Sequence, residues 1–467
     1  MCGIVGLIKK EKVNKSDIIT LETLNNALRH RGPDDAGSYN DNNVILMMRR
    51  LSIVGLSNGK QPFFSKDKKI IGIVNGEIYN YAELKAILKK KNLQLKTKSD
   101  CEVIIGLYQL FGNNFVKYLT GMFAISIYDK AKNKLILVRD RMGEKPIYYY
   151  NTSKILIFSS ELRNIIKYPA VKKDLDPEAI NQYFHIGNII EPRTPFKNVK
   201  KLEAGSILEV NIKTLEKKLI NYWDINKIKR SKKKININEI LASINKANQE
   251  VMNADVKVAL AYSGGIDSHL IYSDLIKEKK NFSSINIQTE KNNDTKIIKK
   301  IHKANNINFF CNSVSNKELI KNFNTMVLAR DEPVADISGS NYFELMKFAK
   351  KKKFKVIIFG HGGDELFWGY KWYNQSALIT SMLNKNKFLA FFFIWKFQIT
   401  KIQSLKAMVK SLFNFFEFFT SIKIYLNSKK KFSNKKFVSF ENNAEFQMFE
   451  KIKYSFFQKE FSKKIKF

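Results

Sequence analysis

The chain has 467 residues, 44% of them hydrophobic, so it is long enough for two or three domains with buried cores and too apolar to be disordered. Its formal net charge is +38, yet only ten of its 81 basic residues are arginines, so we do not expect a specific nucleic-acid partner. The three cysteines, Cys2, Cys101 and Cys311, lie far apart, which excludes a disulfide framework and is typical of a cytoplasmic protein.

The first part of the chain, up to about residue 210, is predicted to mix short strands with helices. Apolar runs bounded by turn residues predict strands at 4–8, 69–77, 122–129, 134–140 and 154–161. Helical spacing between them predicts helices at 16–29, 81–91 and 101–111. This pattern indicates an α+β domain over 2–210, followed by a Lys/Asn-rich linker at 211–240.

A second domain is predicted from residue 241 onwards. Buried-type strands at 256–262, 284–289, 308–314 and 355–360 alternate with helix-like sequence. Such alternation favours an α/β domain with a doubly wound parallel sheet, whose ligands bind beyond the carboxyl ends of the strands.

The tail after residue 370 has a different composition. It is rich in Phe, Lys and Asn and almost free of Gly and Pro, so we expect helices. Its run FLAFFFIW at 388–395 is too short to cross a bilayer. A core helix or the interface of a homodimer is favoured over contact with a membrane surface.

Cys2 directly follows the initiator methionine. Because cysteine is small, we expect Met1 to be removed, which leaves a thiol and a free α-amine on one residue. An α-amine has a pKa of about 7.7–8.0 and can act as a general base towards the thiol. A cysteine at this position means little in isolation, so its interpretation depends on the rest of the sequence.

Six short motifs follow Cys2 in a set order. They are RHRGPDD (29–35), RRLSIVG (49–55), VNGEIYNY (74–81), SDCEVI (99–104), GMFA (121–124) and RDRMGEKPIYY (139–149). Each has an ordinary structural interpretation, such as a hairpin turn at Asn75-Gly76 or a helix N-cap at Asp100. Together they resemble the glutaminase domain of the class II, N-terminal nucleophile glutamine amidotransferases, over residues 2–165. This resemblance implies an αββα sandwich.

The resemblance also implies a role for each matching residue. Cys2 would attack the glutamine amide and form a γ-glutamyl thioester, with Asn75 and the Gly76 N–H as the oxyanion hole. Arg50 would pair with the substrate carboxylate and Asp100 with its ammonium. Cys101 is interpreted as structural. The remaining implied glutamine contacts are Leu51, Ser52, Ile53, Val54 and Glu77.

A phosphate-binding loop is predicted at AYSGGIDS (261–268), which follows a strand and opens a helix. It resembles the pyrophosphate loop of the N-type ATP pyrophosphatases and differs from the Walker motif. The resemblance implies ATP as cosubstrate and Mg²⁺ bound by Asp267. The implied nucleotide contacts are Ala261, Ser263, Gly264, Gly265, Asp267, Ser268, Ile287, Phe359 and Gly360.

The segment FGHGGDELFWGY (359–370) also follows a predicted strand and resembles the family motif SGxGGDELFGGY. Asp364 would be a second Mg²⁺ ligand, and His361, Asp364 and Glu365 are candidates for the acceptor and adenylate site. With the glutaminase motifs, these elements resemble the glutamine-hydrolysing asparagine synthetases. That resemblance implies activation of aspartate as an acyl-AMP and its amidation by ammonia through an internal tunnel.

The sequence departs from the family pattern at several points. His361 stands at a usually acidic position, Phe359 replaces a serine and Trp368 replaces a glycine. No RxPFLD or KxxLR element follows Tyr370, where the resemblance fades. Three alternatives therefore stay open: another acceptor carboxylate such as a sugar uronate in surface-polysaccharide synthesis, a glutaminase with an impaired synthetase half, and a non-catalytic interaction protein.

Overall fold

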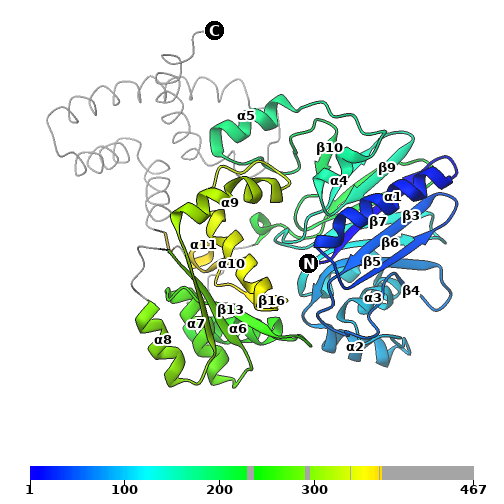
Figure 1. The fold of residues 1–467 in the computed structure, drawn as a ribbon. Helices are drawn as coiled ribbons and strands as arrows, with labels where there is room; N and C mark the ends of the chain where they lie inside the picture. Colours follow the sequence, from blue (N-terminus) through cyan, green and yellow to red (C-terminus); the bar gives the residue numbers. More distant parts are fainter. Residues whose placement is uncertain (229–235, 290–294, 337, 368, 371–467) are drawn as a thin grey trace, which may run out of the picture. The chain divides into compact units, whose positions relative to one another are not determined.

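The computed structural model describes residues 1–228, 236–289, 295–336, 338–367 and 369–370. The chain divides into two compact units, Met1–Gly360 and His361–Phe467 (Figure 1). The first unit contains the predicted N-terminal domain and the part of the second predicted domain up to Gly360. Among the described residues, no helix has the length and apolar character needed to cross a membrane. The predicted tail helices, the run at 388–395 and Trp368 lie outside the described residues.

Two six-stranded antiparallel sheets form the N-terminal domain. Sheet A has the order β10 (Val199–Lys201), β8 (Tyr148–Asn151), β9 (Ile155–Ser159), β1 (Gly3–Lys9), β3 (Val44–Arg50) and β2 (Asp35–Asn40). Sheet B has the order β12 (Lys217–Asn221), β11 (Ser206–Asn211), β7 (Lys134–Arg139), β6 (Gly121–Asp129), β5 (Ile70–Ile78) and β4 (Phe63–Phe64).

Alternating apolar residues place the sheets between two helical layers. In β1, Ile4 and Ile8 pack in the core between the sheets, whereas Val5 and Leu7 pack in the core beneath the helices on sheet A. Those helices are α1 (Lys15–Ala27) and α4 (Leu162–Lys167), and α2 (Tyr81–Lys90) and α3 (Val103–Phe111) cover sheet B. The predicted αββα sandwich is confirmed.

The strands and helices predicted for this domain all form, with ends shifted by a few residues. The boundary of the sheet differs from the prediction, because β12 pairs with β11 and extends sheet B to Asn221. The predicted linker at 211–240 therefore begins too early. β12 was not predicted because it is an exposed edge strand. Its sequence, KKLIN, lacks the alternating apolar residues from which inner strands are predicted. The remaining helical segments are α5 (Pro177–Ile186) and the 3₁₀ turns η1 (Leu28–His30), η2 (Asp100–Glu102), η3 (Gly112–Tyr118) and η4 (Ile225–Lys227).

The second predicted domain is built on a parallel sheet, as expected. Its order is β15 (Phe309–Val314), β14 (Ser283–Thr289), β13 (Val258–Ala261) and β16 (Val356–Ile358). Separate apolar clusters lie on its two faces, one against α7 and the other against α10. The order reverses between β13 and β16, which is the point where ligands bind in such sheets. The helices of this domain are α6 (Ile237–Val251), α7 (Ile266–Lys277), α8 (Thr295–Ala304), α9 (Asn316–Ala329) and α10 (Gly339–Lys351).

Candidate functional site

Cys2 directly precedes β1 and is only 8% exposed. Its Sγ accepts a hydrogen bond from the Leu51 N–H at 3.3 Å, and its carbonyl oxygen accepts one from Arg31 Nε at 2.9 Å. Burial raises the pKa of the Cys2 thiol, while the positive N-terminus opposes that shift. Both the thiol and the backbone of this residue are therefore held in place by partners from the RHRGPDD and RRLSIVG motifs.

Met1 precedes Cys2, so the Cys2 nitrogen is part of a peptide bond. The Met1 Sδ lies 3.6 Å from Lys145 Nζ and 3.8 Å from Arg31 Nη2. Burial lowers the pKa of the Met1 α-amine to about 6. A free amine on Cys2, as the sequence predicts, requires removal of Met1.

The Asn75 side chain lies in β5 with no exposed surface. Neither its Oδ1 nor its Nδ2 has a hydrogen-bond partner among the described residues. A buried amide without partners costs free energy, about 1–3 kcal/mol for each unpaired group, and such a group is typical of a ligand site. The adjacent Gly76 must lack a side chain, because a Cβ there would collide with the Met122 carbonyl oxygen.

Arg50 is buried at the end of β3. Its Nη2 donates to the carbonyl oxygens of Val54 and Gly55, both at 2.9 Å. The loop that follows Arg50 thus folds back around the guanidinium. This arrangement orients the one buried cation that the sequence assigns to the substrate carboxylate.

Asp100 and Glu77 supply negative charge to the same region. Asp100 is buried and accepts a hydrogen bond from the Ile78 N–H at 2.8 Å. Burial, and then the Asp100 charge, raise the pKa of Glu77 to about 7. Arg50 and Asp100 both act on the pKa of the Cys2 thiol. The structure therefore brings the main predicted glutamine-binding residues together around Cys2.

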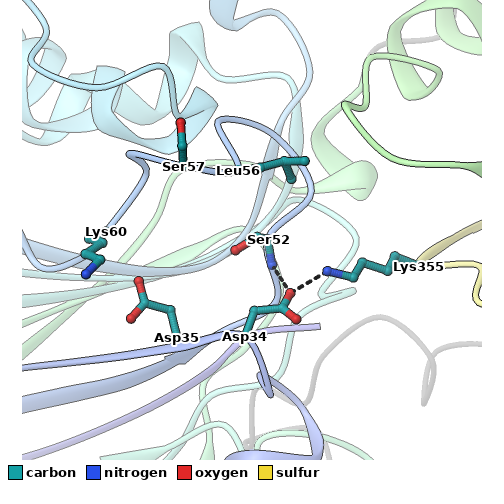
Figure 2. Close-up of a pocket in the computed structure, with 7 residues that line it drawn as sticks. All are labelled: Asp34, Asp35, Ser52, Leu56, Ser57, Lys60 and Lys355. Atoms are coloured by element: carbon teal, nitrogen blue, oxygen red, sulfur yellow. Dashed lines mark hydrogen bonds and ion pairs between the residues drawn. The ribbon is translucent and has the colours of Figure 1, made fainter.

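A cavity of about 380 Å³ borders this region (Figure 2). It shares only Ser52 with the predicted glutamine contacts, and its lining residues are Asp34, Asp35, Ser52, Leu56, Ser57, Lys60 and Lys355. Asp34 accepts hydrogen bonds from the Ser52 N–H at 2.8 Å and from Lys355 Nζ at 2.7 Å. Burial raises the pKa of Asp34, but these two hydrogen bonds outweigh it and lower the pKa.

The predicted ATP loop follows β13 and leads into α7. Gly264 has a φ of +84°, a conformation that glycine adopts without strain. Ser263 Oγ accepts from the Gly265 N–H at 3.2 Å and lies 3.1 Å from the buried Ser268 Oγ. The loop is thus shaped by its own serines, and it exposes its glycines at the helix N-terminus, which favours phosphate groups.

Gly360, the last residue of the first compact unit, packs against this loop. It follows β16, and a Cβ at this position would lie 2.9 Å from Asp267 Cβ and 3.0 Å from the Ser268 nitrogen. Such spacing leaves no room for a side chain. Of the other predicted nucleotide contacts, Ala261 ends β13, Ile287 lies in β14 and the Phe359 ring packs near Tyr342.

The acceptor candidates belong to the second compact unit, so each is described within that unit. Asp364 and Glu365 lie in α11 (Gly363–Phe367), and Glu365 accepts a hydrogen bond from the Gly362 N–H at 3.0 Å. His361 directly precedes Gly362. The described residues contain no group of three or more side chains that could hold a metal ion by themselves. Pairing of Asp267 with Asp364 around Mg²⁺ stays a prediction.

Comparison with known families assigns both halves of the chain. Residues 1–223 match the family described as glutamine amidotransferase domain, and residues 239–446 match asparagine synthase, so the second match continues beyond Tyr370. A Methanocaldococcus jannaschii relative, provisionally named glutamine-hydrolysing asparagine synthetase 2, is 34% identical over 79% of this chain and 76% of its own length. This chain belongs to the glutamine-hydrolysing asparagine synthetase family.

Other relatives in this family are longer. Glutamine-hydrolysing asparagine synthetase 2 of Bacillus subtilis is 35% identical over 79% of the chain, and the match covers 52% of that relative. The chain therefore spans about half the length of this relative. A solved B. subtilis glutamine phosphoribosylpyrophosphate amidotransferase has 14% identity and a TM-score of 0.35 over 77% of this chain and 90% of its own, which is too low to inform the site.

Family motifs contain site residues to which the sequence assigned no role. Arg31 lies in RHRGPDD and Lys145 in RDRMGEKPIYY, so both motifs signalled importance without indicating contact with Cys2 or Met1. Glu161 and Arg163 lie in none of the six motifs, so the sequence did not mark them as candidates. Their contacts appear only in the folded structure, where Glu161 is buried against Arg31.

Proposed function

We propose that the chain is a glutamine-dependent asparagine synthetase that amidates aspartate at the expense of ATP. The proposal rests on two features that this chain combines. Cys2 and Asn75 are buried in the N-terminal domain, and the predicted ATP loop lies where the strand order of the parallel sheet reverses. We also propose a cytoplasmic location, which is supported by the free state of all three cysteines.

Glutamine hydrolysis would begin with Arg50 and Asp100 holding the charged end of the substrate. The Cys2 thiol attacks the side-chain amide carbon and transfers its proton to the leaving nitrogen through the Cys2 α-amine. The developing oxyanion takes hydrogen bonds from Asn75 Nδ2 and the Gly76 N–H, which provides the partner that the buried Asn75 lacks. Ammonia leaves, and water then cleaves the thioester to glutamate.

Aspartate would be activated in the second half of the chain. Its side-chain carboxylate attacks the α-phosphorus of ATP, pyrophosphate leaves, and ammonia then displaces AMP to form the amide. The loop at Ser263–Gly265 and the N-terminus of α7 would hold the pyrophosphate. Mg²⁺, when bound, neutralises phosphate charge, and Asp267 in the first turn of α7 fits this ion because Mg²⁺ needs only one or two protein carboxylates beside phosphate oxygens.

The test of this function measures AMP and pyrophosphate release from ATP with Mg²⁺, ammonium chloride and aspartate. Ammonium bypasses Cys2, so the assay reports on the synthetase half alone. We expect aspartate-dependent release of AMP and formation of asparagine in equal amounts. No release with aspartate, but release with a uronate or another carboxylate, would refute aspartate as the acceptor. No release with any carboxylate would refute the synthetase assignment.

A further inference from the structure

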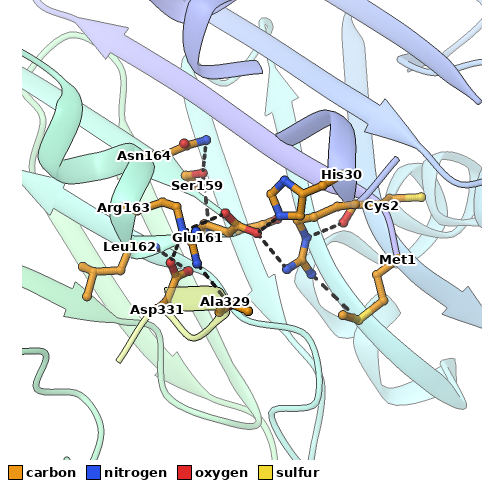
Figure 3. A network of polar contacts seen from close by, with 12 residues as sticks. Met1, Cys2, His30, Ser159, Glu161, Leu162, Arg163, Asn164, Ala329 and Asp331 are labelled. Atoms are coloured by element: carbon orange, nitrogen blue, oxygen red, sulfur yellow. Dashed lines mark hydrogen bonds and ion pairs between the residues drawn. The ribbon is translucent and has the colours of Figure 1, made fainter. Parts of the chain in front are cut away.

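Glu161 is a buried carboxylate that contacts two arginines and a histidine (Figure 3). It follows β9, and only 5% of its side chain is exposed. Its Oε1 lies 2.7 Å from His30 Nε2 and 3.3 Å from Arg31 Nη1, and its Oε2 lies 3.3 Å from Arg163 Nε. A carboxylate buried this deeply is costly unless it is paired, so these contacts fix the geometry around it.

One arm of this cluster ends at the nucleophile. Arg31 contacts Glu161 through Nη1 and donates from Nε to the carbonyl oxygen of Cys2 at 2.9 Å. The Arg31 side chain is 11% exposed, so water offers it few alternative partners. Glu161 therefore positions Arg31, and Arg31 in turn positions the Cys2 backbone through its carbonyl oxygen.

The other arm ends in the half of the chain that carries the parallel sheet. Asp331 is the first residue of the sequence Asp-Glu-Pro at 331–333, called the DEP segment below. It accepts hydrogen bonds from Arg163 Nε at 2.7 Å and from the Leu162 N–H at 2.9 Å. Arg163 also donates from Nη2 to the Ala329 carbonyl oxygen at 3.1 Å. These contacts join residues that are more than 160 positions apart in the sequence.

Arg163 lies between two carboxylates that compete for it. Its Nε hydrogen-bonds to Asp331, while Glu161 Oε2 is buried and has no hydrogen-bond partner among the described residues. If Asp331 moved away, the guanidinium would have an acceptor available on Glu161. The 3.3 Å ion pair of Arg163 with Glu161 would then become a direct hydrogen bond, which would draw the Glu161 carboxylate towards Arg163 and weaken its hold on Arg31.

We propose that Glu161 is a positioning residue for the Cys2 site and that Arg163 couples it to Asp331 in the synthetase half. Displacement of Asp331 transfers Arg163 to Glu161, loosens Arg31 and slows the attack by Cys2. Glutamine hydrolysis is thereby tied to the state of the DEP segment. This inference rests on the proposed glutaminase function and adds a route by which the synthetase half regulates it.

The test compares Asp331→Asn with Glu332→Gln in the full chain. Glu332 is the matched control, because it is adjacent and also forms an ion pair between the halves, with Lys201 at 2.5 Å. No hydrogen bond or ion pair joins Glu332 to Arg163 among the described residues, where the partners of Arg163 are Glu161, Asp331 and Ala329. Coupling between sites commonly changes rates by a few-fold to about thirtyfold. We expect Asp331→Asn to lower kcat for glutamine hydrolysis about tenfold with little change in KM, because Arg50 and Asp100 are untouched. Glu332→Gln should leave both within about twofold.

A second variant separates this relay from simple loss of structure. Arg163→Gln removes the competitor for Glu161, so adding it to Asp331→Asn should bring kcat back to within about twofold of Arg163→Gln alone. General damage to the domain contact would not be reversed in this way. Equal losses in Asp331→Asn and Glu332→Gln, no loss in Asp331→Asn, or a double variant as slow as Asp331→Asn would each overturn the proposal.

The chemical reactivity of Cys2 supplies a readout that does not depend on glutamine. Intact and peptide mass spectrometry would follow alkylation of Cys2 by iodoacetamide in the same four variants. We expect Asp331→Asn alone to change the Cys2 rate several-fold, with Cys101 and Cys311 as internal references. Absence of glutamine hydrolysis in the parent chain would refute the proposed function, whereas unchanged Cys2 alkylation in Asp331→Asn would refute the relay.

Discussion

Around Cys2 the candidate residues are buried side chains, whereas around Ser263 they are largely exposed backbone. Cys2, Arg50, Asn75 and Asp100 are all less than 9% exposed. The loop at Ser263–Gly265 is exposed, and its shape depends on Gly264 and on the close approach of Gly360. We therefore expect the first site to recognise its ligand through side-chain charge and an unpaired amide, and the second through the direction of backbone N–H groups.

This contrast has a consequence for mutagenesis. At a site made of buried side chains, a substitution removes a chemical group while the backbone stays in place. At a site made of backbone, an added methyl group changes the shape while all the hydrogen-bonding groups remain. The two halves should therefore respond to different kinds of substitution, and each response should be confined to one half-reaction.

The largest effect is expected from Cys2→Ala. Loss of the proposed attacking thiol should lower glutamine hydrolysis by on the order of 10⁴-fold or more. Ammonia-dependent asparagine formation should persist, because the parallel-sheet domain keeps its own residues. Product formation with glutamine or with ammonium chloride measures the two outcomes, and survival of glutamine hydrolysis would show that Cys2 is not the nucleophile.

Asn75→Ala should have the next largest effect. Removal of one oxyanion-hole donor typically lowers kcat by about 100–1,000-fold. The same change removes an amide that is buried without partners, so the free energy of unfolding should stay constant or rise. Steady-state glutamine hydrolysis and thermal unfolding test both statements together. A large loss of stability would indicate that Asn75 has a structural role.

Features that depend on residues close together in the sequence were predicted, whereas features that depend on residues far apart in the sequence were not. Strands such as β1 and β5 were predictable because apolar residues recur at a local spacing. The edge strand β12 was not, because its exposed lysines carry no alternating pattern. The roles predicted for Arg50 and Asn75 come from family motifs. The pair Arg163–Asp331 was not found, because its partners are 168 positions apart and meet only through the packing of two domains.

Gly360→Ala should impair only the ATP half. A Cβ would press against Asp267 and the Ser268 nitrogen, and overpacking of this kind typically costs about 1–3 kcal/mol. If this cost falls on the reactive complex, the rate drops by roughly fivefold to 150-fold. Pyrophosphate release with ammonium chloride should fall accordingly, while glutamine hydrolysis stays within about twofold. A matching fall in glutamine hydrolysis would mean that the two sites are not built independently.

The smallest effect concerns pH and Glu77. Burial, followed by the Asp100 charge, raises the pKa of Glu77 to about 7, so its carboxylate is largely protonated below that pH. Glutamine carries an ammonium group that a carboxylate attracts, and therefore KM for glutamine should fall a few-fold as the pH rises from about 6 to 8. A rise in pH should therefore favour glutamine binding but lower the free energy of unfolding. Because the folded pKa lies above the ordinary value of 4.5, Glu77 lowers the free energy of unfolding as the pH rises from 4.5 to about 7, and it changes that free energy little at higher pH.

Glu77→Gln is the control for this pH dependence, because it keeps the shape of the side chain and cannot ionise. In that variant KM should be constant between pH 6 and 8, at a value near that of the parent chain at low pH. Measurement of kcat alongside KM separates this effect from titration of the Cys2 thiol, which acts on kcat. If KM in Glu77→Gln still falls with rising pH, another group is responsible. Asp100 is then the next residue to test, because burial also raises its pKa and it is the proposed partner of the glutamine ammonium.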